Sequence, residues 1–190
     1  MSDRARDVRM SRERSTAISF DLGVHNFACV IARLGETTEL LDMRLVDLRP
    51  AKRPIRGVSL ASAARRTLLA LPAPDVALVE RQMPKNISAR QLELEIYRFY
   101  AEEGRVRVFS IDPARVKTHF SLRGVGRTKK RSAVVAAQRV LSDERRIAIT
   151  SKRALSATRD FVAARKKDDY ADGLLQLVYF AETLWPRLVR

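Results

Sequence analysis

Four acidic residues of this chain stand where carboxylates can carry out chemistry. Asp21 interrupts the apolar run "STAISFDLGVHNFACV" (15–30), Glu80 ends the apolar run "DVALVE" (75–80), and Asp169 and Asp172 lie in "KKDDYAD" (166–172). Residues spaced like Asp169 and Asp172 share one face of a helix. An unpaired carboxylate within a buried strand costs roughly several kcal/mol, so Asp21 requires a partner.

A divalent cation would be such a partner. Carboxylates that lie together raise each other's pKa unless a cation lies between them, and their oxygens suit hard ions such as Mg2+ or Mn2+. Two such ions about 4 Å apart clamp the attacking and leaving oxygens of a phosphodiester cleavage. Each acid alone has a simpler interpretation, because Glu80 can pair with Arg81 and Asp168 or Asp169 can cap a helix. Only the combination indicates a metal-dependent nuclease.

The charge of the chain points to a polyanionic partner. Lys and Arg number 37 against 22 Asp and Glu, which gives a formal net charge of +15 and a pI of about 10.9. Such a positive field attracts nucleic acid. The segment "RGVGRTKKR" (123–131) is especially basic, and its cationic side chains are expected to contact DNA phosphates: Arg123, Arg127, Lys129, Lys130 and Arg131. Charge alone is equally compatible with a basic structural protein.

The elements that must position the acids follow from the hydrophobic pattern. It predicts an α/β protein with a mixed sheet flanked by helices, with strands over 17–22, 27–34, 38–48, 75–80 and 105–111. Helices are predicted over 60–71, 88–103, 132–141 and 169–185, the last burying Leu174, Leu177, Val178 and Ala181. Segments 49–60 and 112–130 are expected to be loops. Asp21 and Glu80 would then lie at strand ends, and Asp169 would begin the last helix.

The composition favours one domain. The 190 residues, 46% of them hydrophobic, suffice for a single domain over 15–190, preceded by a basic disordered arm over 1–14. The lone cysteine, Cys29, excludes a cysteine metal cage and suits a reducing intracellular compartment, either viral and cytoplasmic or organellar. No apolar run approaches the roughly 20 residues of a membrane span, so no membrane partner is expected.

Three segments resemble, in order and spacing, the acidic motifs of the RuvC-like Holliday junction resolvases, most closely the branch of poxviruses and fungal mitochondria. They are "ISFDLGVHNFACV" (18–30), "DVALVERQ" (75–82) and "KKDDYADGLLQ" (166–176), and the resemblance covers about residues 16–184. Sugar-kinase, actin and Hsp70-type ATPases also open with a strand and "DLG". Those proteins need two lobes and glycine-rich phosphate loops, which 190 residues with seven glycines cannot supply.

The resemblance implies a ribonuclease H-like fold and a homodimer that makes paired, metal-dependent nicks in four-way DNA junctions. By position, Asp21 would bridge two Mg2+ ions, for which Mn2+ substitutes, and Glu80 would hold one of them. Asp169 and Asp172 would complete the ligand set, with Asp168 as the alternative to Asp169. Family members also place a lysine near the catalytic centre, and Lys130, or its neighbour Lys129, matches it. Its ammonium would hold the scissile phosphate.

The stretch after Glu80 carries a second resemblance. Bacterial RuvC has a bulky apolar side chain three residues after this glutamate, the offset at which Met83 stands here. Met83 would wedge between bases at an opened junction, or else it fills a gap in the core. Lys85, in the same stretch, is expected to contact DNA.

The helix over 88–103 is the candidate dimer interface. Its Leu92, Ile96 and Phe99 are expected to face the core, whereas Leu94 and Tyr97 lie on other faces and could meet a partner chain. Two other functions are compatible with the sequence. One is a nuclease of the same fold that acts on RNA, and the other is a basic nucleic-acid-binding protein without catalytic activity.

Overall fold

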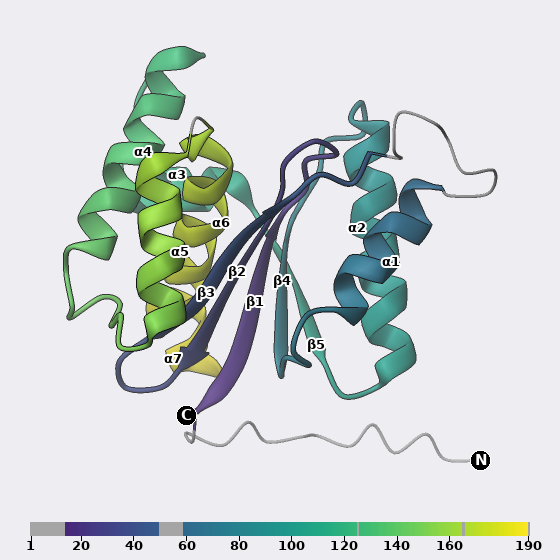
Figure 1. Ribbon diagram of the computed structural model, residues 1–190, viewed down its shortest axis with the longest axis horizontal. Coiled ribbons are helices and arrows are strands. Elements are labelled where there is room, and N and C mark those ends of the chain that lie inside the picture. Colours follow the sequence, from purple (N-terminus) through teal and green to yellow (C-terminus); the bar gives the residue numbers. More distant parts are fainter. Residues whose placement is uncertain (1–13, 50–58, 125, 165, 190) are drawn as a thin grey trace.

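The computed structural model describes residues 14–49, 59–124, 126–164 and 166–189, without the side chains of residues 103, 127 and 129. A five-stranded sheet in the order β3-β2-β1-β4-β5 forms the centre of the protein (Figure 1). The first three strands pair antiparallel, whereas β1–β4 and β4–β5 pair parallel, so the sheet is mixed, as predicted. The strands are β1 (Ser15–Asp21), β2 (Phe27–Leu34), β3 (Glu39–Val46), β4 (Val76–Glu80) and β5 (Arg107–Ile111).

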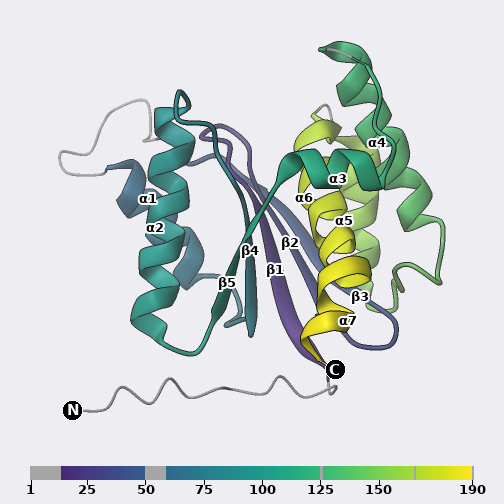
Figure 2. The same ribbon diagram turned by 180° about the vertical axis from the view of Figure 1, so that it is seen from behind.

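Helices cover both faces of this sheet (Figures 1 and 2). On one face lie α1 (Leu60–Leu69) and α2 (Ile87–Glu103). The other face carries α3 (Pro113–His119), α4 (Arg127–Leu141), α5 (Lys152–Ala163) and α6 (Lys167–Tyr179). The last helix continues through a π-helical segment (Phe180–Leu184) into α7 (Trp185–Leu188). In the described part of the chain, no helix is both long enough and apolar enough to cross a membrane.

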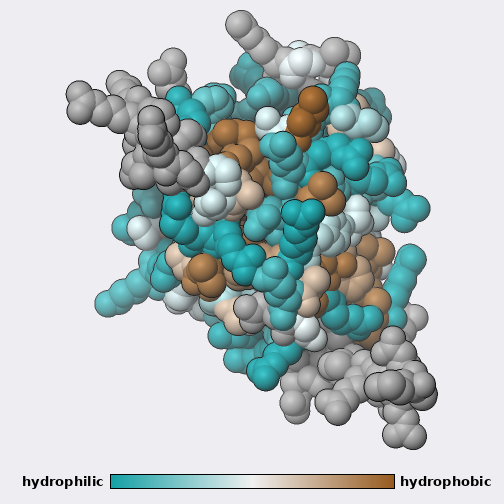
Figure 3. Space-filling view, turned by 90° about the vertical axis from the view of Figure 1, so that its right-hand side faces the viewer, coloured by the Kyte–Doolittle hydropathy of each residue, from teal (hydrophilic) through white to brown (hydrophobic). Residues whose placement is uncertain are grey.

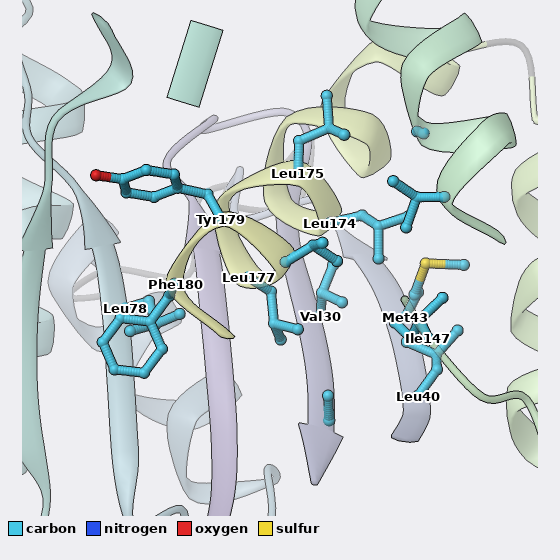
Figure 4. Close-up of a cluster of buried hydrophobic side chains, with 14 of the residues drawn as sticks. Val30, Leu40, Met43, Leu78, Ile147, Leu174, Leu175, Leu177, Tyr179 and Phe180 are labelled. Atoms are coloured by element: carbon cyan, nitrogen blue, oxygen red, sulfur yellow. The ribbon is translucent and has the colours of Figure 1, made fainter. Parts of the chain in front are cut away.

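The sheet separates two hydrophobic cores, because successive side chains of a strand point to opposite faces. In β1, Ile18 and Phe20 pack toward α1 and α2, whereas Ala17 and its alternating neighbours face α6. We call the core on the α6 side of the sheet the α6 core. In it, Leu174 and Leu177 pack over Val30 of β2 (Figure 4). Asp21 has the parity of Ala17 and Ser19, so it faces the α6 side of the sheet.

Gly173 brings α6 unusually close to β2. A Cβ atom at this position would lie 3.2 Å from Cγ2 of Val30 and 3.9 Å from Cβ of Ala28. The missing side chain therefore lets the helix backbone approach the strand, and the carboxylates on the same helix lie close to the sheet.

Most of the predicted elements are present, but the expected loop over 112–130 is wrong. That segment contains all of α3, and α4 begins at Arg127 rather than near residue 132. The start of α3 carries a signal, since Asp112 accepts a hydrogen bond from the N–H of Ala114 at 2.9 Å and Pro113 occupies the first turn.

Helix α5 was also missed. The side chain of Ser151 caps it by accepting from the N–H of Ala154, and its buried residues are Ala154, Ala157 and Phe161. The hydrophobic residues of α5 recur with a clear helical period, so the sequence does carry a signal for this helix. The predicted arm over 1–14 lies outside the described residues except for Arg14, and most of the predicted loop over 49–60 also lies outside them.

Candidate active site

Asp21 and Glu80 lie side by side because two parallel strands end together. In the pairing of β1 with β4, Ser19 is opposite Leu78 and Phe20 is opposite Val79, and each acid is the next residue of its strand in that register. Both acids face α6, since Leu78 belongs to the α6 core and Glu80 shares its parity. The side-chain amide of Gln82 donates to Oε2 of Glu80 at 3.3 Å, which helps to orient that carboxylate.

Helix α6 brings Asp172 to the same place. Nε2 of Gln176 donates to Oγ of Ser19 at 2.9 Å, to the carbonyl of Leu78 at 3.2 Å and to the carbonyl of Phe20 at 3.3 Å. Asp172 precedes Gln176 by four residues, which is about 6 Å along the helix axis. Two strand residues, from Leu78 to Glu80, span a similar distance of roughly 6.6 Å. Asp172 therefore lies above the two strand ends.

A pocket of about 320 Å³ opens where these three acids meet. Asp21, Glu80 and Asp172 line it together with Gln176. The remaining lining residues come from α3, α4 and the segment between them, and they are Pro113, Val116, Lys117, Leu122, Gly126, Lys130 and Ala133. The pocket therefore combines an acidic floor with a wall that is partly apolar and partly cationic.

Two acids of the pocket, Asp21 and Asp172, hold protons more tightly than ordinary carboxyl groups. Burial raises the pKa of Asp21 well above its ordinary value, and the nearby charges of Glu80 and Asp172 raise it further. Desolvation raises the pKa of Asp172 to about 6, and the charge of Glu80 adds to the effect. The side chain of Asp172 still opens to solvent through the pocket. Carboxylates held together in this way favour the binding of a cation.

Asp168 and Asp169 differ in their surroundings. Nζ of Lys130 donates to Oδ2 of Asp168, and this bond raises the pKa of the lysine. Burial alone would raise the pKa of Asp168, but the bond from Lys130 brings it below its ordinary value. Oδ2 of Asp169 is buried and accepts no hydrogen bond from the described residues. Burial, followed by the charge of Asp168, raises the pKa of Asp169. Asp169 thus has a coordinating atom to spare, whereas Asp168 is already paired.

The donor chemistry of the pocket suits a hard divalent cation, because three carboxylates line it. Of the described residues, Asp169 does not line the pocket, although its charge contributes to the raised pKa of Asp21 and of Asp172. Within the described ranges, no three carboxylate, imidazole or thiol side chains already converge tightly enough to coordinate one ion. Like charges without a cation repel one another, so binding requires side chains such as Asp21 and Asp172 to turn toward a shared point.

The predicted DNA-contacting residues whose side chains are described lie at the protein surface. Met83 is 64% exposed, so the alternative that it fills a core gap is wrong. Lys85, Arg123 and Arg131 are also exposed. Arg127 and Lys129 belong to the first turn of α4, and their side chains lie outside the described part of the structure.

Two polar side chains that line the pocket, those of Lys117 and Gln176, were not among the predicted site residues. Lys117 lines the pocket from α3, and its positive charge partly offsets the rise in the pKa of Asp172. Its segment was predicted to be a loop, and a loop gives no indication of which side chains face the pocket. Gln176 follows Asp172 by one turn, a spacing visible in the sequence, but its contacts to two strands are visible only in the fold.

Known proteins resemble this chain in fold rather than in sequence. No protein-family model matches the chain, and no curated protein matches it. Among solved structures, it is similar to the yeast mitochondrial Holliday junction resolvase Ydc2, with 19% identity and a TM-score of 0.69 over 94% of this chain and 82% of that one. It is also similar to the fowlpox virus resolvase in complex with substrate Holliday junction DNA, with 20% identity and a TM-score of 0.61 over 89% and 99% of the two chains.

A third similar structure is RuvC of Thermus thermophilus, with 14% identity and a TM-score of 0.58 over 87% of this chain and 95% of that one. Identity at this level shows shared architecture. The fold that the resemblance implies is therefore confirmed by structures that match nearly the whole chain. The chain has the ribonuclease H-like fold found in these Holliday junction resolvases.

Proposed function

We propose that this protein is a Holliday junction resolvase, a metal-dependent endonuclease that makes paired, symmetric nicks in four-way DNA junctions. The observation that carries the proposal is the meeting of Asp21, Glu80 and Asp172 from three separate elements around one pocket in a strongly basic chain. Charge repulsion makes such a cluster unfavourable unless a cation is bound there. The fold, shared with solved resolvases, supports the same reading.

Each residue of the site has a proposed task. Asp21, Glu80 and Asp172 would hold two Mg2+ ions, with Mn2+ able to substitute, and Asp169 would contribute its unpaired Oδ2. Mg2+ supplies an activated water and charge stabilisation in phosphodiester hydrolysis. The ammonium group of Lys130 would leave Asp168 and bind the scissile phosphate instead, since the lysine side chain is largely exposed.

Junction DNA is the proposed substrate. The fowlpox resolvase has been solved with its Holliday junction, and the exposed Met83 and Lys85 of this chain follow directly on the strand that ends in Glu80. Met83 would insert between bases opened at the crossover, while Lys85, Arg123, Arg127, Lys129 and Arg131 would contact phosphates.

The decisive experiment incubates the protein with a labelled synthetic four-way junction, with and without Mg2+ or Mn2+. We expect symmetric nicks in opposing strands only with metal. Phosphate contacts carry little sequence information, so binding should weaken steeply with salt while preference for the junction over a duplex of equal length persists.

The same assay separates the alternatives. A nuclease that acts on RNA would cleave structured RNA and spare the junction. A protein without catalytic activity would bind both and cut neither in any metal. Equal affinity for junction and duplex throughout a salt titration would contradict junction selectivity.

A homodimer is the proposed working form, because a four-way junction offers two equivalent strands to a two-fold assembly. As predicted, α2 buries Leu92, Ile96 and Phe99 in the core. Its outer surface exposes Leu94 by 50% and Ile87 by 70%, one heptad apart on the same face. Figure 3 looks onto this side of the molecule, where hydrophobic residues lie among hydrophilic ones.

The interface is tested by changing one residue of that helix. We expect light scattering to detect a dimer of the wild type at micromolar concentration, and the half-buried Tyr97, when changed to Glu, to give a monomer that still binds metal. The control is Leu69→Glu on α1, where the side chain is 66% exposed. A monomeric wild type, both free and with junction bound, would contradict the paired-nick mechanism.

A further inference from the structure

Gln176 is a buried polar residue in the centre of a hydrophobic helix face. Only 4% of it is exposed, and the neighbouring residues Leu174, Leu175 and Leu177 are fully buried. A buried amide costs free energy unless it is hydrogen-bonded, and a leucine at this position would avoid that cost. Packing alone therefore does not explain why a glutamine stands at this position.

The hydrogen bonds of Gln176 join two strands that carry catalytic acids. Its Nε2 reaches Oγ of Ser19 and the carbonyl of Phe20 on β1, and also the carbonyl of Leu78 on β4. The Phe20 carbonyl belongs to the peptide group whose nitrogen is that of Asp21. The Leu78 carbonyl lies two residues before Glu80. One side-chain nitrogen thus bridges both strands immediately below the two acids.

The same residue also fixes the helix that brings the third acid. Asp172 precedes Gln176 by one turn of α6, so the anchor that holds the helix to the sheet also sets the height of Asp172 over the strand ends. Gln176 itself lines the pocket with Asp21, Glu80 and Asp172. A single side chain is therefore in contact with every element that supplies an acid of the pocket floor.

We infer that Gln176 is a positioning residue for the metal site: its amide clamps β1, β4 and α6 together and so fixes the spacing of Asp21, Glu80 and Asp172. The inference rests on the proposed function, in that it assigns these acids to metal binding. Groups that orient metal ligands typically change metal affinity by about 10- to 100-fold when they are removed.

The test compares Gln176→Met with the wild type. Methionine has a similar length and shape but lacks the N–H donors, so the packing is largely kept while the clamp is lost. We expect the Mn2+ dissociation constant, measured by calorimetry on the protein without DNA, to rise by roughly 10-fold. The Mg2+ concentration that gives half-maximal cleavage should rise in parallel, with the KM for the junction unchanged.

Two control variants separate positioning from stability. Val140→Ala opens a cavity in the same core without touching the pocket, so it should lower the melting temperature. The Mn2+ dissociation constant and the Mg2+ concentration for half-maximal cleavage should both stay within about 2-fold of the wild type. Ser19→Ala removes one of the three acceptors and leaves both carbonyl bonds, so its effect should be smaller than that of Gln176→Met.

The outcomes are distinct. If Gln176→Met changes the Mn2+ dissociation constant and the Mg2+ requirement for cleavage no more than Val140→Ala does, the inference is wrong, although the proposed function stands. If the wild type binds Mn2+ but cuts no junction, while Gln176→Met still weakens binding, the proposed function fails and the inference survives. A wild type that binds no Mn2+ overturns both.

Discussion

Changing Asp21 to Asn is expected to abolish junction cleavage while junction binding stays near the wild-type level. Asp21 ends β1 beside Glu80 and lines the pocket under Asp172, so it is placed to contact both proposed ions. Asparagine offers a metal ion one neutral amide oxygen, whereas aspartate offers two carboxylate oxygens that share a negative charge. Losing several kcal/mol of charge stabilisation slows cleavage by roughly 10³-fold or more, since each 1.36 kcal/mol is about tenfold.

Binding should survive because removing a negative charge from a DNA-contacting surface does not weaken attraction to phosphates. The measurements are single-turnover cleavage in Mg2+ and junction affinity in its absence. Asp160→Asn on the exposed face of α5 is the matched control, because it makes the same chemical change away from the pocket. Full cleavage activity in Asp21→Asn would rule out the two-metal mechanism.

The sequence was informative about these acids because strand ends and a helix start leave local signals. The apolar run before Asp21 and the run before Glu80 each end at a carboxylate, and the parallel pairing of β1 with β4 then brings the two residues together. The predicted burial of Leu174, Leu177 and Val178 was likewise confirmed, because hydrophobic period reports the inner face of a helix.

The wall of the pocket that α3 and α4 form was less predictable, for a physical reason. The segment with Lys117 is a short helix whose stability depends on a cap by Asp112 and on one buried residue, Val116, so its hydrophobic period is almost absent. The choice between Asp168 and Asp169 also depends on tertiary contacts. Both begin the same helix, but Lys130 of α4 pairs with Asp168, whereas the buried Oδ2 of Asp169 accepts no hydrogen bond from the residues that the structure describes.

The acidic cluster also makes the effect of metal on stability depend on pH. Without metal, the folded-state pKa of Asp172, about 6, lies above its ordinary value of 3.8, and that of Asp21 is raised as well. A raised carboxyl pKa gives stability that is fully present below the ordinary value and is lost as the pH rises through the folded value. The metal-free protein should therefore lose stability between about pH 4 and the region above pH 6.

Mg2+ should reverse this trend, because a cation replaces the protons that the acids hold. Metal at about 100 times its dissociation constant adds roughly 2.7 kcal/mol, which corresponds to a rise of about 5–10 °C in the melting temperature of a chain of this size. We expect that rise at about pH 8, and little or none at about pH 5, where protons compete for Asp21 and Asp172. Differential scanning calorimetry with and without Mg2+ at both pH values measures it.

Asp172→Asn provides the variant in which the charge cluster is reduced. Removing one of the repelling carboxylates should raise the melting temperature of the metal-free protein near neutral pH, and the same change should reduce the stabilisation by Mg2+, since a ligand is lost. Glu144→Gln, a solvent-exposed carboxylate outside the pocket, should change neither quantity. An Mg2+-induced rise that is equal at about pH 5 and about pH 8 in the wild type would show that the titrating acids of this pocket do not bind the metal.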